Sequence, residues 1–418
     1  MDERLVIRGG KPLMGSLVAS GSKNASLYAI AAALLTADPV TLRNAPAIAD
    51  VGEMLDLLTA LGATVDGTED EIQIQVPEIT THRAPDKHVA ATRASFLVMG
   101  PLLARDGEAS CAPPGGDVIG VRPLDVHLDG FRALGADVSR DGAAWMAKSP
   151  KLTGARIFFD YPSVLGTVNL IFAAALADGE TTLVNAAAEP EVQMICEMLI
   201  SMGAQIGGHG SNTITIEGVE RLHGTDFTII PDRIETGTFL LAGAATGGDV
   251  TVEHSAPLHL DSLLTKLREA GVDLSTTEDS IRVCCTDPEG LRAIQLQAVP
   301  YPGYATDLHA PMAAMLTQVH GVSIIHERVF ENRLLYVGEL RSMGAHITVG
   351  GQSVMIEGPT PLFGTNVRAL DVRAGAATFI AGLAADGETS IRDIIHIDRG
   401  YAHLVERLQS LGADVERT

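Results

Sequence analysis

The sequence has few aromatic residues, little basic charge and no long apolar run. Among its 418 residues only 4% are aromatic and one is tryptophan, whereas 43 are glycine and 46% are hydrophobic. A chain of this length exceeds what one hydrophobic core usually supports, so we expect two domains. The scarcity of large rings and the abundance of small side chains favour an α/β protein whose helices pack closely.

Basic residues are outnumbered, with 30 lysines and arginines against 52 acidic residues and a formal net charge of −22. Nucleic acids and anionic membranes attract proteins through lysine and arginine, so we expect this chain to bind neither. A small anion can still bind where the few basic residues gather at one site.

The longest apolar run, residues 25–37, is too short to span a bilayer. The first residues do not resemble a secretory leader. The four cysteines, Cys111, Cys196, Cys284 and Cys285, lack the spacing of metal ligands. We therefore expect a cytoplasmic protein with ordinary buried thiols.

A sixfold internal repeat runs along the chain. Each copy ends a helix at a glycine and then starts a strand, and these glycines lie 73, 68, 68, 73 and 68 residues apart. Such regular intervals indicate six copies of one structural unit. Glycine here supplies the left-handed conformation that ends a helix. The glycines are Gly62, Gly135, Gly203, Gly271, Gly344 and Gly412.

Each copy also pairs an amphipathic helix with one that is apolar nearly all round. In the first amphipathic helix Val51, Met54, Leu55 and Leu58 follow helical spacing. The second kind is rich in alanine and glycine, so we expect it to be buried. Its copies are expected at residues 25–36, 94–104, 167–177, 236–245, 308–319 and 375–385. These elements predict an α/β fold built of α+β repeats.

Polar residues gather at the starts of the buried helices, where free N–H groups and the helix dipole favour anions. Such residues also serve as N-caps, which is the simpler interpretation for any single helix. Basic residues recur at several starts, which favours a multiply charged ligand. The clusters are Ser22-Lys23-Asn24, Thr92-Arg93, Ser163 with Thr167, Glu235-Thr236, Thr306-Asp307 and Asp371 with Arg373.

A glycine- and proline-rich segment, residues 113–127, carries Asp117 and then Arg122. It resembles the catalytic loop and uracil-binding stretch of the UDP-N-acetylglucosamine 1-carboxyvinyltransferases (MurA), a family of enolpyruvyl transferases that catalyses the first committed step of peptidoglycan synthesis. The match is more specific than the related 5-enolpyruvylshikimate-3-phosphate synthases would explain. Further motifs of the family stand in order at residues 21–24, 93–95, 232–238, 302–307, 329–333, 371–374 and 396–401.

The resemblance implies a two-domain inside-out α/β barrel, the enolpyruvyl transferase fold, with helices inside and sheets outside. It places three repeats in each domain and the substrate cleft between the domains. We expect one domain at residues 22–232, which includes the loop, and the second at residues 1–21 plus 233–418.

The resemblance also implies the binding residues. Arginine suits phosphoenolpyruvate because its planar fork donates to two oxyanion oxygens at once. The phosphoenolpyruvate set is Lys23, Asn24, Arg122, Arg333, Arg373 and Arg399. The uridine-nucleotide set is Asn24, Arg93, Arg122, Pro123, Leu124, Asp125, Val126, Ser163, Val164, Leu165, Gly166, Asp307, Val329 and Phe330.

The reaction that the family catalyses is an addition followed by an elimination. A hydroxyl attacks C2 of phosphoenolpyruvate while C3 takes a proton, and the resulting ketal loses phosphate. These steps need a base, an acid and cations. The resemblance implies Asp307 as the base and Lys23 and Arg399 as further catalytic residues, and it places Asp117 where the acid, commonly a cysteine, stands.

Asp117 can donate a proton only if burial or a neighbouring carboxylate raises its pKa. The thiolate that epoxides such as fosfomycin alkylate is absent from this position, so we expect insensitivity to fosfomycin. Cys111 lies on the strand before the loop, and we do not expect it to replace Asp117 as the catalytic acid. His396 and Asp398 resemble a metal pair, but no third ligand is evident, so we expect neither metal nor cofactor.

Several positions depart from the family pattern on the diphosphate and sugar side. Leu165 stands where a small residue is usual and Val168 where glutamate is frequent, while Ala188 replaces an arginine and Gln193 an aspartate. Ala47 and Ala49 replace residues that are often larger or charged. Compensated drift would leave the 3-hydroxyl of UDP-N-acetylglucosamine as the acceptor. A paralogue acting on UMP or another uridine nucleotide in nucleoside natural-product biosynthesis would show the same departures.

An alternative of another class is a catalytically silent paralogue that binds a UDP-sugar and regulates. Such a protein would keep Arg122 to Val126 and lose Lys23, Asp307 or Arg399, all of which are present. We therefore expect an active transferase whose partners are phosphoenolpyruvate and a uridine nucleotide, UDP-N-acetylglucosamine in the first place.

Overall fold

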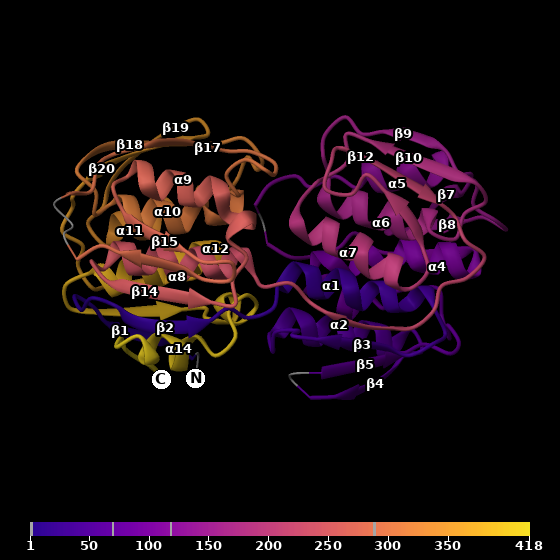
Figure 1. Cartoon of the computed structure of the whole chain (residues 1–418), viewed down its shortest axis with the longest axis horizontal. Helices are drawn as coiled ribbons and strands as arrows, with labels where there is room; N and C mark the ends of the chain where they lie inside the picture. The colour runs from indigo at the N-terminus through magenta and orange to yellow at the C-terminus, as the bar shows by residue number, and fades with distance from the viewer. Residues whose placement is uncertain (1–2, 69–70, 118, 287–289) are drawn as a thin grey trace. The chain divides into compact units, whose positions relative to one another are not determined.

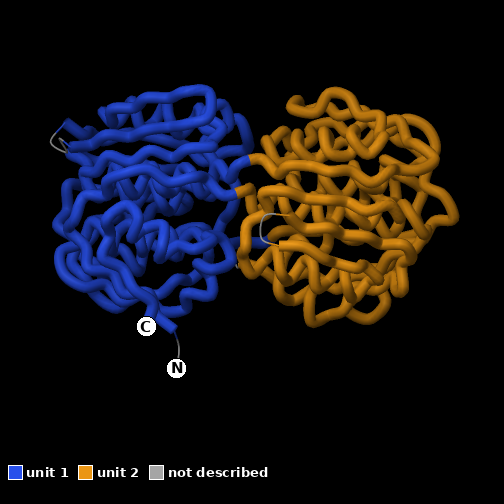
Figure 2. Tube along the Cα trace, turned by 60° about the horizontal axis from the view of Figure 1, so that its bottom comes forward, with its two compact units in different colours: residues 1–20, 118–121, 231–418 blue, residues 21–117, 122–230 orange. Residues whose placement is uncertain are grey.

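The computed structural model describes residues 3–68, 71–117, 119–286 and 290–418. The chain divides into two compact units, which Figure 2 colours separately. Unit 1 comprises Met1–Ser20, Val118–Val121 and Pro231–Thr418, and unit 2 comprises Gly21–Asp117 and Arg122–Ile230. The predicted domain of residues 22–232 held the whole loop, whereas residues 118–121 group with unit 1.

Three small sheets belong to unit 1 in the part of the chain that the structure describes. The first has the order β21 (Asn366–Arg368), β22 (Glu388–Arg392), β1 (Leu5–Arg8) and β23 (Asp414–Arg417). The second has the order β15 (Asp273–Thr276), β16 (Ile281–Cys284), β14 (Asp249–Glu253) and β2 (Met14–Val18). The third has the order β17 (Gln295–Ala298), β18 (Gly321–Glu327), β20 (Ser353–Gly358) and β19 (His346–Gly350).

Unit 2 repeats this plan over its own described residues. One sheet has the order β11 (Gln205–Gly207), β12 (Thr213–Glu217), β10 (Glu180–Val184) and β9 (Arg156–Phe158). Another has the order β13 (Thr225–Thr228), β3 (Val40–Arg43), β5 (Glu71–Gln75) and β4 (Thr64–Gly67). The sheet β6 (Glu108–Cys111), β8 (Ala144–Lys148) and β7 (Asp137–Asp141) has three strands, and a single parallel bridge from Arg83 to Ser110 lies beside it.

Every four-stranded sheet joins one parallel pair of strands to antiparallel neighbours. The parallel pairs are β21 with β22, β2 with β14, β17 with β18, β9 with β10, and β3 with β13. The same pairing pattern in sheets from distant parts of the chain is the structural form of the sequence repeat.

Two sets of helices accompany the sheets. The amphipathic set is α2 (Ala49–Ala60), α5 (Asp125–Ala133), α7 (Pro190–Ser201), α9 (Asp261–Glu269), α11 (Tyr336–Ser342) and α14 (Leu404–Ser410). The buried set is α1 (Lys23–Ala32) with η1 (Ala33–Leu35), η2 (Arg93–Val98) with α4 (Met99–Asp106), α6 (Val164–Ala174), α8 (Arg233–Ala245), η5 (Thr306–Leu308) with α10 (His309–Leu316), and α12 (Val372–Ala384). Short helices α3 (Asp86–Ala91), η3 (Pro257–Leu260) and α13 (Ile395–Asp398) lie in connections.

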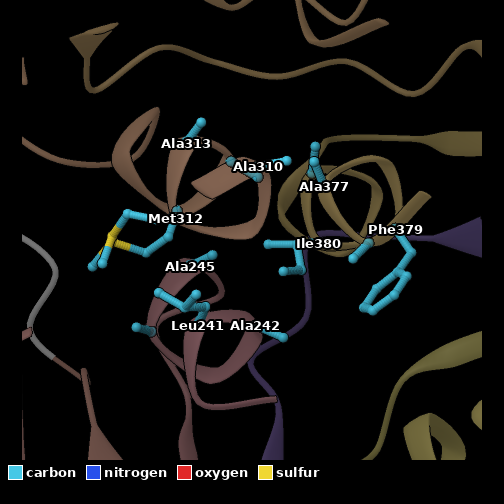
Figure 3. Packing of buried hydrophobic residues seen from close by; sticks show 14 of the residues in the cluster. Leu241, Ala242, Ala245, Ala310, Met312, Ala313, Ala377, Phe379 and Ile380 are labelled. Carbon is cyan, nitrogen blue, oxygen red and sulfur yellow. The ribbon is translucent and has the colours of Figure 1, made fainter. Parts of the chain in front are cut away.

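The buried helices form the centre of each unit, as predicted. In unit 1, α8, α10 and α12 pack against one another between the sheets (Figure 1). Figure 3 shows Leu241 of α8, Met312 of α10 and Ile380 of α12 where the three helices meet, and all three side chains are fully buried. Alanine and glycine fill much of the remaining helix surface, which lets the backbones approach closely.

Proline interrupts two helices that were predicted as continuous. Pro101 stands in the first turn of α4 and Pro311 in the first turn of α10, and each α-helix follows a 3₁₀ segment. Proline lacks the N–H that a continuous α-helix needs, so it is tolerated where an α-helix begins. The helix predicted at residues 94–104 therefore begins as 3₁₀ turns.

The six repeat glycines adopt the expected conformation. Their φ angles are +115°, +92°, +103°, +91°, +103° and +87° in chain order, a region that side chains disfavour. The prediction that each glycine ends a helix before a strand is confirmed. Within the described residues, no helix combines the length and the apolar character that crossing a membrane requires.

Candidate active site

A buried charge cluster in unit 1 joins three of the predicted site residues. Asp307 lies in η5, Arg333 between β18 and α11, and Arg373 in the first turn of α12. Nη2 of Arg333 is 2.7 Å from Oδ1 of Asp307, and Nη2 of Arg373 is 2.8 Å from Oδ2. The arginine side chains are 3% and 7% exposed and that of Asp307 is 25% exposed, so water screens these contacts little.

The cluster keeps Asp307 ionised. Burial alone would raise the pKa of the Asp307 carboxyl, but the charges of Arg373 and Arg333 more than offset burial and hold the pKa well below its usual range. Nε of Arg333 is buried without a hydrogen-bond partner among the described residues. A buried N–H donor of this kind is costly unless a ligand accepts from it.

Tyr401 and Gly400 shape the other side of Arg373. The Tyr401 hydroxyl lies 3.4 Å from Nη1 of Arg373 and 3.0 Å from Oγ1 of Thr238. A Cβ on Gly400 would lie 2.4 Å from Cγ1 of Val372, so only glycine allows this close approach to α12. The half-buried Arg399 precedes this contact at the end of α13.

Lys23 is held at the start of α1 in unit 2. Ser22 caps the helix by accepting from the Ala25 N–H, and Nζ of Lys23 lies 2.8 Å from Oδ2 of Asp50 on α2. Both charged side chains are buried. Sequence reasoning missed Asp50, although an aspartate beside the apolar Val51 in an amphipathic helix was a signal for a buried partner. Asn24 follows on α1 and is half-buried.

The Asp117 segment brings two arginines together. Arg122 donates from Nη2 to the Asp117 backbone carbonyl at 2.6 Å, and the Arg93 guanidinium donates to the carbonyl of Arg122. Burial, followed by the nearby charge of Arg122, lowers the pKa of Arg93 to about 10. Two neighbouring cations favour an anion between them. Asp117 itself is half-buried, and Val118 lies outside the described residues.

Residues 119–121 are fixed within unit 1. The Val121 N–H donates to Oε1 of Glu331 at 2.6 Å, and the Asn332 N–H donates to the Ile119 carbonyl at 3.0 Å. Gly120 has a φ of +145°, and an added Cβ would lie 2.5 Å from the Glu331 carboxylate. Within unit 1, residues 119–121 are therefore anchored to the segment of residues 331–332.

The predicted uridine stretch lines a cavity of about 450 Å³ in unit 2. Oδ1 of Asp125 accepts from the Val126 N–H at 2.9 Å and from the Tyr161 hydroxyl at 2.8 Å. Tyr161 was not predicted as a site residue, since its contact joins segments far apart in the chain. The cavity is lined by Arg93, Pro113, Pro114, Arg122, Pro123, Leu124, Asp125, Leu128, Asp129, Arg132, Arg140 and Trp145.

The predicted diphosphate segment begins α6. Ser163 is the N-cap and accepts from the Gly166 N–H at 3.2 Å, while Val164 and Leu165 are half-buried. On the sugar side of the prediction, Val329 and Phe330 lie in unit 1, and the Arg333 guanidinium is 5.7 Å from the centroid of the Phe330 ring. Each predicted residue therefore has a described position within its own unit.

Two departures from the family pattern contact each other. Nε2 of Gln193 donates to the backbone carbonyl of Ala188 at 3.0 Å. The residues that replace a frequent arginine and a frequent aspartate thus form a neutral hydrogen bond. Val168 is fully buried in α6, where an apolar side chain fits. These contacts favour local compensation over a rebuilt acceptor site.

Cys111 and the His396–Asp398 pair lack the features of catalytic groups. Cys111 is buried at the end of β6, and burial raises the pKa of its thiol to about 12. The Asp398 carboxylate is engaged by the Arg417 guanidinium. Within the described ranges, no group of three or more His, Cys, Asp or Glu side chains could hold a metal ion.

The chain is similar to known proteins over nearly its whole length. The family model for EPSP synthase (3-phosphoshikimate 1-carboxyvinyltransferase) matches residues 7–408. UDP-N-acetylglucosamine 1-carboxyvinyltransferase 2 of Carboxydothermus hydrogenoformans is 47% identical over 415 residues, which cover 99% of both chains. UDP-N-acetylglucosamine 1-carboxyvinyltransferase of Magnetococcus marinus is 47% identical over 418 residues, again covering 99% of both. The crystal structure of the enolpyruvyl transferase NikO from Streptomyces tendae matches with a TM-score of 0.90 at 27% identity, covering 100% of this chain and 99% of its own.

Proposed function

The chain belongs to the enolpyruvyl transferase family described by the EPSP synthase model, and from this premise we infer that it is a UDP-N-acetylglucosamine 1-carboxyvinyltransferase. It transfers the enolpyruvyl group of phosphoenolpyruvate to the 3-hydroxyl of UDP-N-acetylglucosamine and releases phosphate. This reaction is the first committed step of peptidoglycan synthesis. The observation that carries the assignment is 47% identity over 99% of the chain to enzymes of that name.

We propose Asp307 as the base that takes the proton of the attacking hydroxyl. Arg333 and Arg373 hold its carboxylate when no substrate is bound, and both belong to the proposed phosphoenolpyruvate set. When phosphate and carboxylate oxygens engage these guanidiniums, their hold on Asp307 weakens and the pKa of Asp307 rises towards its usual value. The base therefore gains proton affinity when the electrophile arrives.

We propose Asp117 as the acid that protonates C3, with Arg122 beside it on the same segment. Lys23 and Arg399 complete the cations that stabilise the phosphate as it leaves.

UMP is the second candidate acceptor, because the departures at Leu165 and Ala188 lie on the predicted diphosphate and sugar side and leave the predicted uridine stretch intact. The decisive measurement is phosphate release with phosphoenolpyruvate and either UDP-N-acetylglucosamine or UMP, with Asp307→Asn as the background control. We expect release with UDP-N-acetylglucosamine only. Phosphate release with UMP alone would show that UMP, not UDP-N-acetylglucosamine, is the acceptor. Release with neither would favour a silent UDP-sugar-binding protein.

We further propose that the enzyme acts in the cytoplasm. All four cysteines are free thiols, and three of them are buried. Reducing compartments keep thiols in this state. Mild oxidation that leaves the four thiols unpaired and the enzyme active would be consistent with this, whereas a native disulfide between any two of them would oppose it.

A further inference from the structure

A buried carboxylate, Glu327, links the two chain segments that carry Asp307 and Arg333. Glu327 ends β18 and is 0% exposed. On one side, Oε2 accepts from Oγ1 of Thr306 at 2.8 Å and from Nδ1 of His309 at 2.9 Å. Asp307 lies between these two partners in the chain. Glu327 therefore holds the segment of the proposed base from both of its ends.

The other oxygen of Glu327 holds the arginine segment. Oε1 accepts from the Val329 N–H at 2.7 Å and from the Phe330 N–H at 3.2 Å. Arg333 follows three residues later and closes the arrangement by pairing with Asp307 at 2.7 Å. A single side chain thus fixes the separation of the two residues that form the ion pair.

His309 and Tyr336 fix the orientation of Glu327. Both are almost fully buried, and the Tyr336 hydroxyl lies 2.9 Å from Nε2 of His309. An ionised carboxylate only accepts hydrogen bonds, so Nδ1 of His309 carries the proton and Nε2 accepts from Tyr336. Burial lowers the pKa of His309, which keeps the imidazole neutral in this arrangement.

We propose that Glu327 is a positioning residue that sets the geometry of the Asp307–Arg333 pair for the transfer reaction. The proposal rests on the proposed function, because Asp307 is the base only if the chain is an enolpyruvyl transferase. Among the described residues, Glu327 forms no hydrogen bond or ion pair with Asp307 or Arg333. It acts through Thr306 and through the backbone of residues 329–330. Buried networks with every member bonded are rigid enough for this task.

The positioning role of Glu327 predicts a change in the pH dependence of catalysis as well as a change in stability. Arg333 is one of the two charges that hold the pKa of Asp307 low. If Glu327 is lost, Thr306 and the 329–330 backbone are released, the Asp307–Arg333 contact loosens, and the pKa of Asp307 rises. The acidic limb of kcat/KM reports the free enzyme, so it moves to higher pH in such a variant. A purely structural role would lower the melting temperature and leave this limb in place.

The test compares Glu327→Ala, Glu327→Gln and Ser323→Ala with the wild type, in steady-state assays across pH and in thermal unfolding. Ser323 is a matched control, since it is buried on the same strand and accepts from the Ile294 N–H at 3.2 Å, away from the Asp307 cluster. For Glu327→Ala we expect kcat to fall on the order of 10- to 100-fold, as for a misplaced catalytic group, with the acidic limb shifted upward. Glutamine preserves the shape and can bond Thr306 and His309 with reversed donors, so it restores much of the rate.

The result that overturns the proposal is a Glu327→Ala enzyme with wild-type kcat and an unmoved acidic limb below its melting temperature. If this variant does not fold, the variant Thr306→Val provides the test. It removes the hydrogen bond from Thr306 to Glu327 and leaves the other partners of the buried carboxylate in place. An upward-shifted limb in Thr306→Val, reversed in Thr306→Ser, supports the proposal, and an unmoved limb rejects it. Absence of turnover in the wild type would instead reject the proposed function.

Discussion

Asp117, the proposed acid, determines the sensitivity that we expect toward epoxide inhibitors. A carboxylate is a weaker nucleophile toward an epoxide than a thiolate, so we expect wild-type activity to be unchanged after incubation with fosfomycin. Asp117→Cys should be inactivated in a time-dependent manner, with one adduct detected by mass spectrometry of the peptide that contains residue 117. Cys111 provides the internal control, because its burial keeps the thiol protonated and unlabelled. A covalent adduct on Asp117 in the wild type would contradict the prediction.

Asp307 should titrate differently before and after substrate binds. In the free enzyme burial raises the pKa of its carboxyl, but Arg373 and Arg333 outweigh burial, so the net pKa is low. A depressed pKa means that the group stays ionised until the pH falls through the folded value. In the proposed complex the substrate anions share these guanidiniums, and we expect the pKa of Asp307 to rise. We therefore expect the acidic limb of kcat at higher pH than that of kcat/KM. Coincident limbs would show that the arginines do not leave Asp307.

The residues that could be named from the sequence were those that the family resemblance implies as substrate contacts, such as Lys23 and Arg333. Their protein partners were not predicted. Asp50 pairs with Lys23 across two helices, and Glu327 acts through Thr306, which lies 21 positions earlier in the chain. Such contacts depend on how the elements pack, and a motif read along one stretch of chain does not contain that information.

At the scale of the element, two of the repeat glycines differ in the space around them. Both have a positive φ, but an added Cβ would be crowded at only one of them. Gly412 has a φ of +87° and open space around an added Cβ, whereas at Gly62, with a φ of +115°, an added Cβ would lie 2.5 Å from the Glu78 carbonyl oxygen. Gly412→Ala should therefore cost about 1–2 kcal/mol of unfolding free energy, from the backbone alone. Gly62→Ala should cost more. Urea unfolding of both variants measures the difference, and equal losses would contradict the argument.

Element types were predictable because the periodicity of buried and exposed positions is local. The buried helices α8 and α12 follow from their apolar composition. They begin at Arg233 and Val372, earlier than the predicted residues 236 and 375, because Asp232 and Asp371 cap them. The 3₁₀ turns before α4 and α10 were not predicted, although Pro101 and Pro311 marked them. A proline near a helix start is compatible with several local conformations, and tertiary packing selects among them.

At the scale of the whole molecule, residues 5–8 form a strand inside a sheet whose other strands come from the end of the chain. β1 pairs with β22 on one side and β23 on the other, and Ile7 is 0% exposed. Ile7→Ala should reduce the unfolding free energy by about 2–5 kcal/mol, as for other buried isoleucines. Met14→Ala on β2 is the control, since Met14 is 51% exposed and its loss should change stability by less than about 0.5 kcal/mol. A smaller effect for Ile7 than for Met14, in thermal or denaturant unfolding, would contradict this.

The sixfold repeat made the architecture predictable from spacing, because one supersecondary unit recurs. The small sheet β6-β8-β7 shows where the repeat is imperfect. Its fourth strand is reduced to the bridge between Arg83 and Ser110, beside the strand that leads to the Asp117 segment. The sequence spacing of 73 residues in this copy did not reveal the missing strand.

The pairing of Asp307 with two arginines also bears on ligand design. A simple anion that approaches Arg333 and Arg373 competes with a carboxylate that the protein itself supplies. A molecule that joins an anionic group to a neighbouring hydroxyl would engage the guanidiniums and, at the same time, give the displaced Asp307 a donor. The two natural substrates divide these tasks between them. A linked bisubstrate inhibitor would combine them, and the effective concentration created by the link would add to its affinity.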